Sequence, residues 1–288
     1  MDRRSFLRAL SSLAISACSR SDRRAAGSLR PASDSDVNAL IDERLAERNV
    51  DYVSLLERTP HILRRAPAGT TASLRKTLRE HPEAAAEMNA FRVSALKRLR
   101  ASSVEPAAKM LMLDAQLEKV PHAVTTCMEH FVGVHDLLKI WGHPDALALV
   151  GLFHAMYGTE YFVLDLLDYR RPEDRVRLRS VVGEQTERWI LQYGLMLSHA
   201  FVDEARAAGG ATAHLAFFET TDAVPEAITP SDFVALAELQ VANAYEPFTH
   251  SQATSDLDNV LPYAPLRDFV SSGAKDAIDR TLRAFPAK

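Results

Sequence analysis

From Asp34 onward, apolar residues recur along the chain with the period of an α-helix, and the alternation typical of β-strands is rare. The first apolar stripe runs from Val37 to Leu45, and Asp34 or Ser35 is available to cap its helix. The pattern therefore predicts an all-α protein.

The same period predicts further helices, whose ends are marked by Pro, where a helix can begin, and by Gly, where it can end. We expect these helices over residues 83–100, from Glu105-Pro106 onward, and over residues 125–141, 145–157, 184–205 and 230 to about 247. The chain then divides into an N-terminal helical region, residues 37–119, and a helical domain, residues 120–288.

The first residues do not follow this pattern and resemble an export signal. Arg3-Arg4 precedes a short apolar stretch, residues 9–17, as in twin-arginine signals, and Ile15 to Cys18 resembles the lipobox of bacterial lipoproteins. We expect residues 1–18 to direct export, with the mature chain periplasmic or anchored to a membrane by lipid at Cys18. The alternative is a cytoplasmic protein with a basic N-terminus.

Residues 19–36 are rich in Ser, Arg and Ala and show no apolar period, so we expect a flexible tether there. The chain contains two Cys residues, Cys18 and Cys127. If Cys18 carries a lipid, Cys127 is the one remaining thiol, and no disulfide can form within the chain.

Composition and the absence of several motifs disfavour common classes of protein. The chain has 34 Lys and Arg against 38 Asp and Glu, and its scattered basic residues argue against nucleic acid as a partner. It has 11 Gly and neither G-x-G-x-x-G nor G-x-x-x-x-G-K, which disfavours nucleotide-binding enzymes of the Rossmann and P-loop types. It also lacks H-E-x-x-H and G-x-S-x-G, the motifs of helical zinc proteases and of many serine hydrolases.

Two of the predicted central helices each place one His on an apolar face. His130 shares its face with Val134 and Leu138, and His154 shares its face with Leu147 and Val150. A lone His in such a position is more often a hydrogen-bonded core residue than a ligand. Two on consecutive helices favour a metal site, because imidazole is the commonest metal ligand.

The segment from residue 121 to about 196 resembles the HD-like superfamily of helical metal enzymes. It reads PHAVTTCMEHFVGVHDLLKIWG, VGLFHAMYGTE and VGEQTERWILQYGLM. These blocks are similar to an uncharacterised bacterial branch with LLEHLxGVxDLLxxWG and GLFHSxYGT motifs. The resemblance implies an HD-like helical bundle and, in the superfamily, metal-dependent phosphohydrolase or di-iron oxygenase activity. A first His, a His-Asp pair and a later Asp hold one or two metals in that superfamily.

Carried over by position, His130 matches the first His and His154 the His of the pair. Ala155 replaces the paired Asp, and Asn243 stands where the branch often has a late Asp. An amide oxygen is a poorer ligand for a transition metal than a carboxylate. The resemblance therefore implies a mononuclear site, with His130, His154 and Asn243 among its candidate ligands.

A carboxylate is needed to complete a site of two His and one acid. Glu160 and Glu187 are the candidates, although a solvated surface position is the more usual place for either. His122 and Tyr157 are candidate catalytic residues together with Glu160. The alternatives are that His122 caps a helix and that Tyr157 is anchored in the core.

Three further residues have structural interpretations. We expect His135, next to Asp136, to be partly exposed on a different arc of its helix from His130. We expect Trp141 and Trp189 to lie in the core.

The favoured hypothesis is a metal-dependent hydrolase or oxygenase that uses Fe, Mn or Zn and acts on a small-molecule substrate. The alternative is a metal-free, ligand-binding lipoprotein that has lost its acidic ligands. A third hypothesis is a helical module that binds a protein partner. Membrane contact is expected only through the lipid.

Overall fold

The computed structural model describes residues 32–47, 49–58, 70–122, 125–159, 166–207 and 228–286. The predicted export signal and Glu160 lie outside the described residues. The predicted tether lies outside them as far as residue 31, and its end at residue 36 is wrong because a helix already begins at Asp34.

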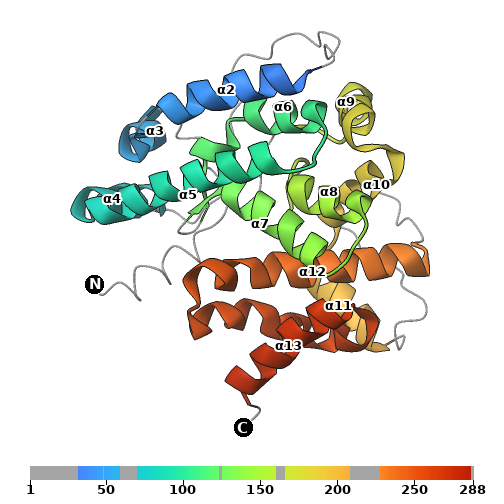
Figure 1. Ribbon diagram of the computed structural model, residues 1–288. Coiled ribbons are helices and arrows are strands. Elements are labelled where there is room, and N and C mark those ends of the chain that lie inside the picture. Colours follow the sequence, from blue (N-terminus) through green and yellow to red (C-terminus); the bar gives the residue numbers. More distant parts are fainter. Residues whose placement is uncertain are drawn as a thin grey trace. The chain divides into compact units, whose positions relative to one another are not determined.

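The prediction of an all-α protein is confirmed (Figure 1). The α-helices are α2 (Asp34–Ala46), α3 (Tyr52–Arg58), α4 (Thr70–Glu80), α5 (Pro82–Ala101), α6 (Pro106–Asp114), α7 (Cys127–Ile140), α8 (Asp145–Phe153), α9 (Pro172–Val182), α10 (Glu184–Leu195), α11 (Ser198–Ala207), α12 (Pro230–Ser251) and α13 (Ser272–Ala284). Two 3₁₀ segments, η2 (Leu117–Lys119) and η3 (Thr254–Phe269), and a hairpin of β1 (Pro121–His122) and β2 (Thr125–Thr126) complete the described elements. Of the helices described, none has the length and apolar character needed to cross a membrane.

Contacts group the described residues into two compact units. Unit 1 comprises the described parts of Met1–Val132 together with Ala155–Val182, and unit 2 comprises Gly133–His154 with the described parts of Gly183–Lys288. The predicted boundary between residues 119 and 120 stays a prediction.

The first described helix of unit 1, α2, begins earlier than either predicted cap allows. Ser33 is the N-cap of α2, where its side chain accepts a hydrogen bond from the Asp36 backbone N–H and the Asp36 carboxylate accepts one from the Ser33 N–H. This reciprocal capping box satisfies two backbone donors that the start of a helix leaves without partners. The prediction of Asp34 or Ser35 as the cap is therefore wrong.

A buried arginine fastens the end of α2 to α5. The Arg92 side chain is fully buried, and its guanidinium donates to the backbone carbonyl oxygens of Arg44 (2.8 Å) and Glu47. These carbonyls lie at the C-terminal end of α2, where a helix lacks its own donors and favours a positive charge.

In unit 2, α12 is fixed to its neighbours by buried carboxylates. The Asp232 carboxylate takes part in a capping box with Thr229 and also accepts hydrogen bonds from Trp189 Nε1 (2.7 Å) and Arg188 (2.8 Å) of α10. The indole of Trp189 is therefore half-buried at a polar contact, and the expectation that it lies in the core is wrong.

The next buried carboxylate of α12, Glu238, fixes the start of α13. It accepts hydrogen bonds from the backbone N–H and the hydroxyl of Ser271, the N-cap of α13, and it lies 2.9 Å from His143 Nε2. The side chain of Glu238 is 1% exposed, so these partners replace the water that it loses.

Most of the predicted helices are present, but several of their ends differ. Thr125 and Thr126 pair with β1 instead of opening α7, and α8 ends at Phe153, before a turn that reaches Gly158. The predicted helix 184–205 is interrupted at Met196, which has extended backbone, and α12 continues through Pro247 to Ser251.

We predict that Asp232 stabilises unit 2 in a pH-dependent manner. Burial raises the pKa of its carboxyl, but hydrogen bonds from Trp189 and Thr229 and the charge of Arg188 outweigh that effect and hold the pKa below its usual value. The stabilisation is then present above the unfolded-state pKa of about 3.9 and is lost as pH falls through the lower folded-state pKa.

Urea denaturation should show that Asp232→Asn lowers the free energy of unfolding by about 1–3 kcal/mol at pH 7. The difference from the wild type should shrink as the pH is lowered from 5 to 3. Asp203→Asn, at an exposed position of α11, is the control and should change the free energy of unfolding by less than about 0.5 kcal/mol. An Asp232→Asn effect that is independent of pH would contradict the assignment.

Candidate functional site

The predicted ligand His154 lies at the C-terminal end of α8 and is 3% exposed. Its Nδ1 lies 2.7 Å from the carbonyl oxygen of Gly151. Because a carbonyl oxygen can only accept, Nδ1 carries the proton, and the lone pair of the neutral imidazole is on Nε2. A backbone carbonyl orients metal-binding imidazoles in the same way.

Tyr193 of α10 brings together two of the predicted ligands. Its ring lies edge-on to His154, with centroids 5.6 Å apart, and its hydroxyl is hydrogen-bonded to the side chain of Asn243 on α12. Burial raises the pKa of the Tyr193 hydroxyl well above its usual value, and neighbouring Tyr263 raises it further, against the effect of Asn243. Tyr193 is therefore a neutral phenol at physiological pH.

Glu187 lies on the same helix as Tyr193 and is completely buried. The helix that carries it packs against α8, where Thr186 donates a hydrogen bond to the carbonyl oxygen of Ala146 (3.3 Å). The alternative of a solvated surface position is therefore wrong for Glu187. Glu and Asp are almost never fully buried without a polar partner or an ion, so the Glu187 carboxylate is held by interactions inside the fold.

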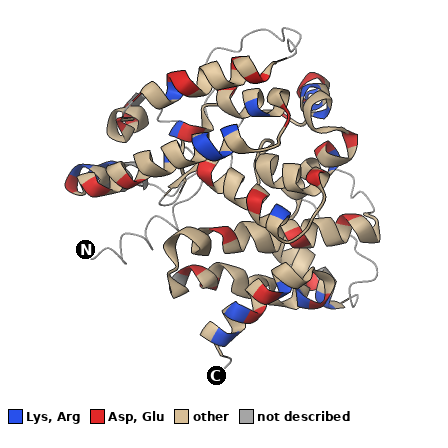
Figure 2. Ribbon diagram, viewed as in Figure 1, with Lys and Arg blue, Asp and Glu red and all other residues tan. Residues whose placement is uncertain are grey.

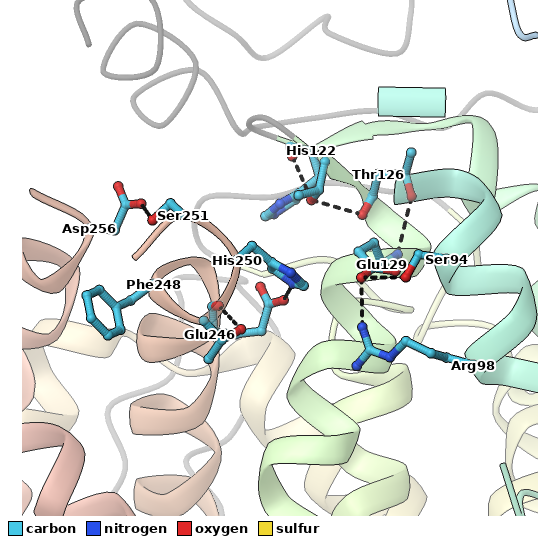
Figure 3. Close-up of polar contacts among 12 residues, drawn as sticks. Ser94, Arg98, His122, Thr126, Glu129, Glu246, Phe248, His250, Ser251 and Asp256 are labelled. Atoms are coloured by element: carbon cyan, nitrogen blue, oxygen red, sulfur yellow. Dashed lines mark hydrogen bonds and ion pairs between the residues drawn. The ribbon is translucent and has the colours of Figure 1, made fainter. Parts of the chain in front are cut away.

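A second buried pair in unit 2 was not predicted. Glu246 of α12 is 1% exposed and is paired with Nε2 of His250 one turn later (Figure 3). The carboxylate lies directly against Gly133 of α7, where a Cβ atom would overlap it. The sequence signal is the four-residue spacing of Glu246 and His250, which we missed because we expected the helix to end near Pro247.

Asn243, Glu246 and His250 lie on one face of α12, because residues three, four and seven apart share a helix face. Tyr193 meets this face at Asn243, and Gly133 meets it at Glu246. The candidate site of unit 2 is this polar face of α12, together with Tyr193, His154 and Glu187.

The remaining predicted ligand, His130, belongs to unit 1. It is 3% exposed, which confirms its expected burial, and it stacks on His122 of β1 with ring centroids 4.2 Å apart and an interplanar angle of 7°. The preceding residue, Glu129, accepts hydrogen bonds from Arg98 (2.7 Å) and Ser94 (3.4 Å) of α5 (Figure 3). The structure thus brings together His122 and His130, while the pairing of His130 with His154 stays a prediction.

Three other residues considered in the sequence analysis differ in burial and in their contacts. Tyr157 is half-buried in unit 1 with its ring edge-on to Tyr169, at a centroid distance of 6.5 Å. His135 is 8% exposed and bonded to Asp136 (2.8 Å), so it is more buried than expected. Trp141 is half-buried against α13 instead of lying in the core.

Among the residues that the structure describes, no group of three or more His, Cys, Asp or Glu side chains could hold a metal ion. Of the predicted ligands, His154, Glu187 and Asn243 lie in the described part of unit 2.

Comparison with known proteins finds one family model that matches part of the chain. Residues 111–197 match the model of a domain of unknown function (DUF6817). This match covers 87 of the 288 residues (111 to 197 inclusive) and ends before α12. No curated protein and no solved structure matches the chain.

We predict that Gly133 is required because the Glu246 carboxylate fills the space beside it. Gly133→Ala should lower the free energy of unfolding by about 1–3 kcal/mol, as overpacking does, although Ala is the better helix former. In the background of Glu246→Ala the same change should be neutral or stabilising. A double-mutant cycle measured by urea denaturation checks this, and additive effects would contradict it.

Proposed function

We propose that the protein is a metal-dependent hydrolase or oxygenase with an HD-like helical scaffold and a mononuclear site in which His154 and Glu187 are ligands. One observation carries the proposal. Glu187 is completely buried in the same unit as His154, on a helix that packs against α8, whose C-cap is His154. The resemblance of residues 121–196 to the HD-like superfamily supports the choice of His154.

The orientation of His154 suits it to bind an ion. The carbonyl of Gly151 holds the proton on Nδ1, so that Nε2 is the atom that would bind the ion. A buried carboxylate supplies the negative charge that a divalent cation needs in surroundings of low dielectric. When bound, the ion would act as a Lewis acid toward substrate or would activate water or dioxygen.

The surrounding residues favour one ion over two. Ala155, in place of the paired acid, is buried with 1% exposure and has no side-chain carboxylate with which to bridge two metals. Neutral Tyr193 is suited to hold a substrate oxygen by hydrogen bonding rather than to serve as an anionic ligand.

Metal analysis of the purified protein tests this proposal. After exposure to Fe²⁺, Mn²⁺ or Zn²⁺ without oxygen, followed by desalting, the wild type should retain about one ion per chain. His154→Ala and Glu187→Gln should each lose most of that metal, because each removes one ligand. His199→Ala, which changes an exposed His on α11, should retain it.

Circular dichroism of each variant shows whether it is folded. A wild type without stoichiometric metal would overturn the proposal, as would folded His154→Ala and Glu187→Gln variants that keep theirs.

The second candidate function is a metal-free protein that binds a small organic ligand. The hydrogen bond between Asn243 and Tyr193 favours it, because the residue at the position of the late acid already serves a contact within the protein. Under this function the wild type holds no metal, and a small organic ligand raises its melting temperature.

We also propose that the chain is exported and anchored at Cys18, which the Arg3-Arg4 and Ile15 to Cys18 motifs support. Expressed in a bacterial host, the full chain should fractionate with membranes, and Cys18→Ala should move it to the periplasmic fraction. Replacing Arg3 and Arg4 with Lys should block export. A full chain found in the cytoplasmic fraction would contradict this prediction.

A further inference from the structure

A pocket of about 580 Å³ opens on unit 2 beside α13. Its volume is in the range of small-molecule sites. One wall is formed by Ile140, Trp141 and Tyr245, and the other by one face of α13. None of these residues belongs to the site described above.

The first wall is apolar and aromatic. The rings of Trp141 and Tyr245 have centroids 6.5 Å apart, and the side chain of Ile140 is 79% exposed. The indole of Trp141 lies directly on the backbone of α13 at Gly273, where a Cβ atom would overlap it. The absence of a side chain at Gly273 thus allows Trp141 to pack closely on α13 at the side of the pocket.

The second wall is basic at its C-terminal end. Arg280 and Arg283 line the pocket, and α13 carries acidic residues as well as these basic ones (Figure 2). The Arg280 guanidinium lies 5.7 Å from the ring centroid of Phe248. Neither arginine forms an ion pair with any residue of the described ranges.

The Asp279 carboxylate, whose pKa is affected by the charge of Arg283, is already bonded to another arginine. The pKa of Asp279 is lowered chiefly by its hydrogen bonds from Arg267, at 2.5 and 2.9 Å, and only weakly by Arg283. Asp276 is the one acidic residue in the lining, so the pocket carries two positive charges against one negative charge.

We propose that this pocket binds an aromatic carboxylate, with the ring against Trp141 and Tyr245 and the carboxylate against Arg280 and Arg283. A guanidinium pairs well with a carboxylate because its planar N–H groups match both oxygens. A planar ring gains from stacking on the indole and phenol faces. This site is independent of the metal site proposed above.

Calorimetric titration of the full chain with 2-naphthoate tests the proposal. The wild type should bind it, and the uncharged analogue 2-naphthalenemethanol should bind at least about tenfold more weakly. The double variant Arg280→Gln/Arg283→Gln should weaken naphthoate binding about tenfold or more. Lys275→Gln removes a charge from the same helix outside the pocket, and it should change the affinity less than about twofold.

Trp141→Leu should also weaken binding, since it keeps an apolar side chain but removes the stacking face. Thermal unfolding of each variant separates loss of the site from loss of the fold. Absence of naphthoate binding to the wild type would overturn the proposal. So would equal binding of the uncharged analogue, or unchanged affinity in the folded double arginine variant.

Discussion

The burial of negative charge along α12 is the constraint that organises unit 2. Asp232, Glu238 and Glu246 occur at intervals along one helix, and each is about 1% exposed. A carboxylate removed from water costs several kcal/mol unless donors replace its hydration. The donors come from α10, from the start of α13 and from His250, so satisfying the charges also fixes where the neighbouring elements lie.

The same constraint explains why the polar side chains of the candidate site hold defined orientations. Tyr193 is carried by the helix that Asp232 fastens, and its hydroxyl meets Asn243 on the helix that carries the carboxylates. His154 is oriented by the backbone of its own helix at Gly151. Rigid elements place such groups more exactly than loops do.

The sequence predicted the class of fold and most of the helices, because apolar periodicity is a local property that survives in the folded chain. It did not predict that α12 continues past Pro247, because proline removes a backbone donor. The Glu246–His250 pair connects the residues on either side of this proline. It also did not reveal the break at Met196, since apolar residues continue on both sides of it.

For the candidate site, the spacing of apolar residues correctly indicated that His130 and His154 are buried. The burial of Glu187 was beyond that reasoning, because a charged residue on an amphipathic helix is usually at the surface and only the packing of α10 against α8 decides otherwise. The pairing of Asn243 with Tyr193 joins residues 50 positions apart in the sequence (243 − 193), and no local pattern indicates it.

The proline in α12 has one further consequence. Because Pro247 cannot donate to the carbonyl four residues earlier, the last turn of the helix is tied to the rest by one backbone bond fewer than an uninterrupted helix would have. Opening of that single turn would therefore cost less than separating whole helices, and it would expose Glu246 and His250 before Asp232 and Glu238. The imidazole–carboxylate pair of Glu246 and His250 thus lies at the end of α12 that has the fewer backbone hydrogen bonds.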